Sequence, residues 1–226
     1  EDDDGARGRT VRAPRPHDDR LPLFLGLTLV CILGAVAVYL VAVHTELGQR
    51  VDTHLRGGIL QDENPVAYTA TSELLDTISV LSVTLSVAAV MGIALARRLP
   101  HLAVGVGVLV LGANVTTQLL KRGLSRPDLV PGLWPEPGSY PSGHVTVAMS
   151  LAMALILVVL AAMRMMAAVI GSVYALGVGV AVIALDWHRP SDVLGAYLVV
   201  TAWTGLVAAA LGRIPRLADA AEFDGF

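Results

Sequence analysis

Two short polar stretches that interrupt long apolar runs carry residue types suited to phosphoryl chemistry. Residues 121–144, KRGLSRPDLVPGLWPEPGSYPSGH, contain the only lysine of the chain and place three cations, Lys121, Arg122 and Arg126, at the end of an apolar run. Residues 187–192, WHRPSD, add a histidine, an arginine and a carboxylate. Cations and imidazoles gathered at the ends of apolar segments predict a phosphate site, because fixed N–H donors bind phosphate oxygens.

His188 and Asp192 have the spacing of an interacting pair. On a helix, residues four apart lie on one face, and Pro190 favours a helix that begins between them. The carboxylate can then accept a hydrogen bond from one ring nitrogen and leave the other nitrogen free to attack phosphorus. The alternative is a buried His–Asp pair that only ties a loop to a helix, and the spacing does not separate the two.

Ser142, Gly143 and His144 stand at the start of the next apolar run. A hydroxyl and unpaired backbone amides at a helix N-terminus form a place for an anion, whereas His144 taken alone is more typical of an interfacial histidine. Arg126 precedes a proline, which ends local helix and directs the guanidinium, and that group can hold a phosphate through two parallel hydrogen bonds. Lys121 and Arg126 could instead be ordinary lipid-headgroup partners.

The elements that must position these residues are membrane helices. The 226 residues are 54% hydrophobic and 15% charged, and the mean hydropathy is +0.66, whereas soluble domains carry about a quarter charged residues. About 20 apolar residues cross a bilayer as a helix, in which every backbone polar group is bonded within the segment. We therefore expect an all-α bundle of six transmembrane helices, at about residues 21–44, 77–96, 102–120, 145–163, 165–185 and 193–211.

The remaining segments flank or connect this membrane domain, which we place at residues 21–212. Residues 1–20 are polar and lack apolar periodicity, which predicts a disordered tail, and residues 213–226 form a short C-terminal tail. The connector at residues 45–76 includes a stretch, 47–60, that could lie as an amphipathic helix on the membrane surface and cap the bundle. Tyr140 and two tryptophans, Trp134 and Trp187, are typical of the membrane interface.

The distribution of basic residues favours a cytoplasmic N-terminus. In that orientation ten of the sixteen lysines and arginines lie on the cytoplasmic side, as the positive-inside rule expects. With six spans, residues 121–143 and 187–192 share one face whichever way the protein inserts. The charge rule then predicts a multi-pass protein of the plasma membrane whose site faces the extracytoplasmic side.

Three motifs occur here in the order and topology of a known family. Lys121…Arg126-Pro127, PSGH at 141–144 and His188-x3-Asp192 resemble the three signatures of the type 2 phosphatidic acid phosphatase superfamily. These are six-helix membrane lipid phosphatases with a site related to that of vanadium haloperoxidases. The resemblance covers about residues 70–212 and implies a six-transmembrane-helix bundle with a phosphatidic acid phosphatase type 2/haloperoxidase-like core.

The resemblance also implies roles for individual residues. His188 matches the nucleophile that forms a phosphohistidine, Asp192 the carboxylate that orients it, and His144 the general acid. The positions that match the phosphate cradle are Lys121, Arg126, Ser142 and the backbone of Gly143. Neither a metal nor another cofactor is expected, because fixed donors can stabilise the charge of a pentavalent phosphorus.

Two departures from the family pattern both concern cations. Six residues usually separate the lysine and the arginine of the first signature, and here four residues separate them. The third signature usually opens with Ser-Arg six residues before the histidine, where this chain has Ala181 and Val182. The candidates to supply the missing positive charge are Arg189 and Arg122.

The predicted function is that of an integral membrane phosphatase acting on a lipid phosphate or pyrophosphate, of polyprenyl or glycerophospholipid type. Two alternatives stay open: a lipid phosphotransferase, and a non-catalytic membrane protein that binds lipid phosphates. A transporter is disfavoured, because such proteins place ionisable residues inside the membrane and the central parts of the six runs have none. The expected partners are the lipid substrate and the bilayer, not nucleic acid.

Overall fold

The computed structural model describes residues 20–55, 64–131 and 138–212, and every regular element in these ranges is helical. The all-α prediction is therefore confirmed for this part of the chain. The elements in order are α1 (Arg20–Val38), η1 (a π-helical turn, Tyr39–Val43), α2 (Glu46–His54), α4 (Pro65–Asp76), α5 (Val80–Ala96), α6 (Pro100–Gly123), α7 (Gly143–Val158), η2 (Ala161–Met163), α8 (Arg164–Ala184) and α9 (Pro190–Leu211).

Four helical segments in the described ranges are long and apolar enough to cross a membrane, so the chain is a multi-pass membrane protein. These segments are Arg20–Val43, Pro100–Gly123, Ala161–Ala184 and Pro190–Leu211. Helices α5 and α7 are also apolar, but they have only 17 and 16 residues, fewer than the roughly 20 that a full crossing needs. All six predicted apolar runs fall on helices, while six complete membrane spans stay a prediction.

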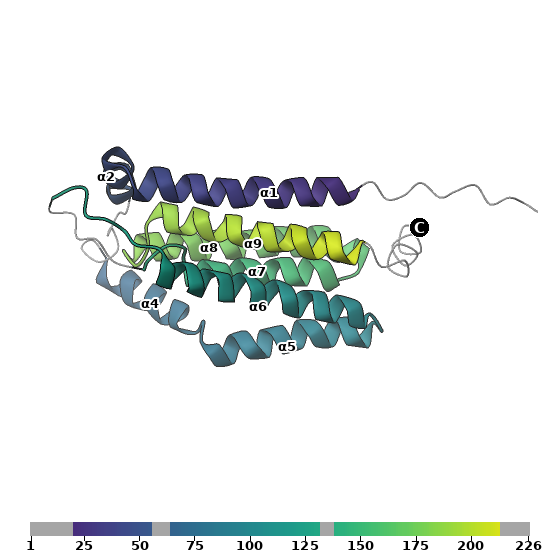
Figure 1. Cartoon of the computed structure of the whole chain (residues 1–226). Helices are drawn as coiled ribbons and strands as arrows, with labels where there is room; N and C mark the ends of the chain where they lie inside the picture. Colours follow the sequence, from purple (N-terminus) through teal and green to yellow (C-terminus); the bar gives the residue numbers. More distant parts are fainter. Residues whose placement is uncertain (1–19, 56–63, 132–137, 213–226) are drawn as a thin grey trace, which may run out of the picture.

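Helix α9 is the centre of the bundle and α1 lies at its edge. Helix α9 packs against α1, α6 and α7, and half of its apolar stretch is buried, against 11% for α1. Figure 1 shows the long helices side by side along one direction, with α1 at one edge and α5 at the other. The exposed leucines and valines of α1 and α8 form the apolar outer surface that a lipid environment requires.

The apolar core consists of two clusters, and one of them supports the polar end of the bundle. The first lies between α5, α6, α7 and α9 and includes Val106 and Leu109. The second lies between α4, α7, α8 and α9 and includes Val145, Val182 and Leu185, which are at most 1% exposed. Close packing of these side chains fixes the starts of α7 and α9 relative to the end of α8.

The two polar stretches meet at one end of the bundle, as predicted. Helix α2, the end of α6 and the starts of α7 and α9 lie together there, opposite the start of α1 and the end of α9 (Figure 1). Which side of the membrane this end faces stays a prediction. The predicted tails, 1–20 and 213–226, lie outside the described residues except for Arg20, which begins α1 instead of belonging to a tail.

Candidate functional site

Asp192 is the centre of the polar cluster at this end of the bundle. Its side chain is 0% exposed, so the charge of the carboxylate requires partners. Oδ1 accepts hydrogen bonds from Arg126 Nη2 at 3.0 Å and Ser139 Oγ at 3.3 Å. Oδ2 accepts one from the backbone N–H of Arg189 at 3.1 Å and lies 3.3 Å from His188 Nδ1. The structure thus forms the predicted His188–Asp192 pair and adds Arg126 to it.

The first turn of α9 sets the direction of the Asp192 side chain. Arg189 is the N-cap residue, with an extended backbone (φ −87°, ψ 156°), and Pro190 follows at the first helical position. Asp192, at the third position, turns back to the backbone N–H of Arg189, which is the returning half of a capping box. Its charge also lies at the positive end of the helix dipole.

The turn between α8 and α9 holds His188 beside this carboxylate. The backbone N–H groups of Trp187 and His188 both donate to the carbonyl oxygen of Val182, at 3.0 and 3.1 Å. Asp186 has a φ of 63°, in the left-handed region where aspartate is enriched, and this reverses the chain. The His188 side chain is 10% exposed, so the imidazole borders the buried carboxylate and still reaches the surface.

The start of α7 presents a hydroxyl that the fold does not use. Ser142 is the N-cap of α7, but its side chain makes no capping hydrogen bond, although serine is favoured at this position because it usually does so. Within the described residues its buried Oγ has no hydrogen-bond partner. The backbone N–H of Ser142 donates to the carbonyl oxygen of Asp192 at 2.9 Å, which joins the N-termini of α7 and α9.

Arg126 also has an unused donor. It is 8% exposed, and its buried Nε has no partner in the described part of the chain. Buried polar groups are normally satisfied, so an unsatisfied Nε and an unsatisfied Ser142 Oγ, both on residues bonded to Asp192, require an explanation. A phosphate oxygen at either atom would accept the hydrogen bond that the fold leaves open, and the N-terminus of α7 itself favours negative charge.

Lys121 reaches this place despite the shortened spacing of the first motif. Helix α6 continues to Gly123, and a methyl group on Gly143 would lie 3.9 Å from Lys121 Nζ. The following loop returns to α6 at Gly138, whose φ of 71° suits glycine and where a side chain would come 2.9 Å from the Lys121 carbonyl oxygen. Leu119, where the usual spacing would put the lysine, is 61% exposed. The shorter spacing therefore places the ammonium beside the N-terminus of α7.

His144 completes the group of predicted residues that meet here. Its ring lies beside that of Trp187, with centroids 5.5 Å apart and planes inclined by 46°. Burial, and then the neighbouring His188 and Lys121, lower the pKa of His144. The two imidazoles thus share one site with a lysine and an arginine.

Comparison with known proteins identifies the family. The family model described as PAP2 superfamily matches residues 102–215, half of the chain, including all three motifs. This chain belongs to the PAP2 superfamily. The predicted family is therefore confirmed.

A solved structure extends the likeness of the fold beyond the matched residues. It is described as the crystal structure of the first transmembrane PAP2 type phosphatidylglycerolphosphate phosphatase from Bacillus subtilis. The similarity covers 85% of this chain and 98% of that one, with a TM-score of 0.61 and 22% sequence identity. No curated protein matches the chain. At this identity the likeness shows a shared fold.

The position at which the resemblance places the arginine of the third signature is occupied by an apolar residue of the core. Val182 is 0% exposed and packs under the site, so no cation lies at that position. Of the two candidate substitutes, Arg189 is 4% exposed and adjoins Asp192 through its backbone. Arg122 is exposed on the last turn of α6, which favours Arg189 as the compensating cation.

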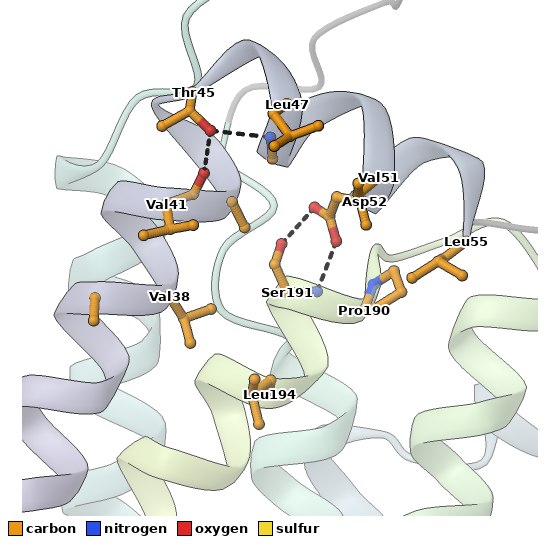
Figure 2. Close-up of a pocket in the computed structure, with 13 residues that line it drawn as sticks. Val38, Val41, Thr45, Leu47, Val51, Asp52, Leu55, Pro190, Ser191 and Leu194 are labelled. Carbon is orange, nitrogen blue, oxygen red and sulfur yellow. Dashed lines mark hydrogen bonds between the residues drawn. The ribbon is translucent and has the colours of Figure 1, made fainter.

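The site contains an acidic residue that sequence reasoning missed, Asp52 of α2. It is 4% exposed and accepts hydrogen bonds from the backbone N–H and Oγ of Ser191, at 2.9 and 2.6 Å (Figure 2). Its Oδ2 also lies 3.4 Å from Arg126 Nη1. The predicted surface helix at 47–60, of which 56–60 lie outside the described residues, thus contributes to the site. The available signal was a pair of polar residues three apart, Gln49 and Asp52.

Tyr140 supports the loop before α7 from inside the protein. Tyr140 is 4% exposed, Trp134 lies outside the described residues, and the interfacial position of these aromatic residues stays a prediction. The phenol donates to the carbonyl oxygen of Ala35 at 2.7 Å, and the ring packs on Gly195 of α9. Burial, and then the negative charge of Asp192, raise the pKa of Tyr140, so the phenol stays a neutral donor.

Proposed function

We propose that this PAP2 protein hydrolyses a lipid phosphate or pyrophosphate, of polyprenyl or glycerophospholipid type, at the extracytoplasmic face of the cell membrane. The observation that carries the proposal is the pair of unsatisfied buried donors, Arg126 Nε and Ser142 Oγ, beside a histidine that is bonded to a buried carboxylate. Donors fixed before the substrate arrives are what stabilises the charge of a phosphoryl transition state.

The His188–Asp192 geometry supports nucleophilic catalysis. With its proton on Nδ1, held by Asp192 Oδ2, His188 has a lone pair on Nε2 that can attack phosphorus. A bond forms between Nε2 and phosphorus as the bond from phosphorus to the leaving oxygen breaks, and His144 gives its proton to that oxygen. Neutral His144 then takes a proton from water, which attacks the phosphohistidine and releases inorganic phosphate.

The remaining cations have binding roles in this proposal. Lys121, Arg126 and the first amides of α7 bind the non-bridging oxygens of the phosphate, and Arg189 supplies the charge of the missing arginine. Side chains that neutralise the transition state in this way do the work that a divalent metal does in other phosphatases. We therefore propose a metal-independent reaction.

An apolar pocket next to the site supports a lipid substrate. It has a volume of about 570 Å³, which lies in the size range of ligand sites, about 300–1,000 Å³. Figure 2 shows it between α1, η1, α2 and the start of α9. Its apolar lining includes Val38, Val41, Leu47, Val51 and Leu194. The Asp52–Ser191 pair forms its polar wall, so a hydrocarbon chain in the pocket would lie beside the phosphate site.

The test is phosphate release by detergent-purified protein from lipid phosphates and pyrophosphates of several chain lengths, with EDTA present. We expect release that persists in EDTA and disappears in His188→Ala. The matched control is His101→Ala, because His101 is exposed at the start of α6, at the other end of the bundle. Full activity of folded His188→Ala would refute the nucleophile, and loss of activity in EDTA would refute the metal-independent reaction.

The same assay addresses the two alternatives. A phosphotransferase would form the phosphohistidine but release phosphate only slowly until an acceptor alcohol is added. A non-catalytic binder would retain the lipid phosphate without forming a phosphohistidine at His188. Phosphate release in water that an added acceptor alcohol does not accelerate excludes both alternatives.

A further inference from the structure

Helix α2 lies outside the residues that the PAP2 family model matches, yet it reaches the centre of the site. Its two buried residues, Gln49 and Asp52, are three apart and therefore on one face. Gln49 Nε2 donates to the carbonyl oxygen of Pro127 at 2.7 Å, next to Arg126. Asp52 contacts Arg126 itself and Ser191 of α9. The helix is thus joined to both polar stretches.

Asp52 holds the first turn of α9 from outside that helix. The backbone N–H of Ser191 is one of the first N–H groups of α9, which have no partner within the helix, and it donates to Asp52 Oδ1 at 2.9 Å. Ser191 Oγ donates to Oδ2 at 2.6 Å. Asp192 is the next residue, so Asp52 fixes the backbone from which the carboxylate partner of His188 projects.

Asp52 also determines which edge of the Arg126 guanidinium is available. Nη1 faces Asp52 at 3.4 Å and Nη2 faces Asp192 at 3.0 Å, while Nε is buried and unpartnered within the described residues. Without Asp52, the two terminal nitrogens could turn together toward Asp192 or toward a bound phosphate. The two carboxylates therefore fix the plane of the guanidinium and compete with phosphate for its terminal donors.

We propose that Asp52 is a positioning residue of this active site, which orients Arg126 for the transition state and weakens its hold on inorganic phosphate. The proposal rests on the phosphatase function proposed above. Only interactions that are stronger in the transition state than in the bound ground state accelerate the reaction. Asp52 would increase turnover in two ways. It restricts Arg126 to one orientation, and it weakens the binding of inorganic phosphate, which favours release of the product.

The test is Asp52→Asn, which removes the charge and keeps the shape of the side chain. We expect kcat to fall by about 10- to 100-fold, the effect of losing a hydrogen bond to a charged group. We also expect inorganic phosphate to bind about tenfold more tightly, because a negative charge near the anion is removed. The measurements are steady-state kinetics with lipid phosphate and titration calorimetry with inorganic phosphate alone.

A residue that only stabilised the fold would not, when replaced, lower kcat and raise the affinity for phosphate at the same time. If kcat and phosphate affinity both fall, Asp52 only supports the fold, and the proposal is overturned. It is also overturned if neither changes, or if phosphate binds more tightly at unchanged kcat. Tighter phosphate binding in a protein without phosphatase activity would refute the proposed function and leave the effect of Asp52 on Arg126 intact.

Variants of two neighbouring residues of α2 serve as controls. Gln49→Leu loosens α2 from Pro127 without changing charge, and it should not tighten phosphate binding. Arg50→Ala changes an exposed residue of the same helix and should alter neither quantity. Tighter phosphate binding in Gln49→Leu would assign the effect to helix docking instead of the carboxylate and would overturn the proposal.

Ser191→Ala gives a second route if Asp52→Asn does not fold. It removes the 2.6 Å hydrogen bond that holds Asp52 Oδ2, but it keeps the negative charge. We expect a lower kcat with a phosphate affinity within about twofold of the wild-type value. A folded Ser191→Ala protein with unchanged kcat would overturn the positioning role.

Discussion

Gly195 of α9 lies directly under the ring of Tyr140, and this contact controls where the loop before α7 runs. In Gly195→Ala the new methyl carbon would lie 2.6 Å from Tyr140 Oη and closer still to two ring carbons. Because nonbonded heavy atoms require about 3.5 Å, the ring must move by about 1 Å. Tyr140 is two residues from Ser142, so the displacement reaches the proposed phosphate cradle.

The magnitude follows from two opposing terms. Overpacking of this kind costs about 1–3 kcal/mol, and replacement of a helical glycine by alanine returns up to about 1 kcal/mol. The control is Gly177→Ala in α8, where the added methyl meets no atom within 4 Å, so only the favourable term applies. The two variants should therefore differ by about 1–3 kcal/mol in the free energy of unfolding, or about 3–9 °C in the thermal midpoint.

The assay is a thermal unfolding curve in detergent, followed by phosphate release at a temperature where both variants are folded. A displacement of about 1 Å near a reacting group can cost about 100-fold in rate, so Gly195→Ala should lose activity while Gly177→Ala keeps it. The double variant Gly195→Ala/Tyr140→Leu replaces the ring with a smaller side chain, and it should recover part of the lost stability. Equal midpoints and equal activities of the two alanine variants would refute the close packing of Tyr140 on α9.

Two further predictions concern Arg189 and the pocket for the lipid chain. Arg189→Ala should lower kcat/KM by about 10- to 100-fold, the effect of losing a hydrogen bond to a charged group. Arg122 is exposed, so Arg122→Ala should change kcat/KM by about twofold or less, and equal effects of the two variants in steady-state kinetics would reject Arg189 as the substitute for the missing arginine. Leu194→Trp, which fills the pocket, should raise KM for a long-chain lipid phosphate and leave KM for a short-chain analogue unchanged; an equal rise for both substrates would place the chain elsewhere.

The positions of the helices could be predicted from the sequence alone. So could those contacts of the site that form between residues close together in the chain. Apolar runs locate membrane helices because lipid forces each segment to satisfy its own backbone. The His188–Asp192 pair follows from a spacing of four and a proline between the two residues, and the first turn of α9 realises it. Both motifs lie at helix ends, where short-range rules apply.

The contribution of α2 depends on contacts that no local rule contains. Asp52 is 74 residues from Arg126 and 139 from Ser191 along the chain, and its segment showed only a mixed, amphipathic composition. The burial of Tyr140 against α1 and α9 could not be predicted for a related reason. An aromatic residue near a helix end usually belongs to the membrane interface, but a glycine on α9 and a carbonyl oxygen on α1 give this ring a buried site.

The buried charges around Asp192 balance one another. The buried groups include two guanidinium side chains, Arg126 and Arg189, and two carboxylates, Asp52 and Asp192, so their formal charges cancel before substrate binds. Lys121 and the helix N-termini then provide the net attraction for phosphate. An arginine at Val182 would have to enter an apolar cluster, where an unpaired charge is costly. In the proposed cradle, the direction in which Arg126 is held therefore matters more than the total positive charge.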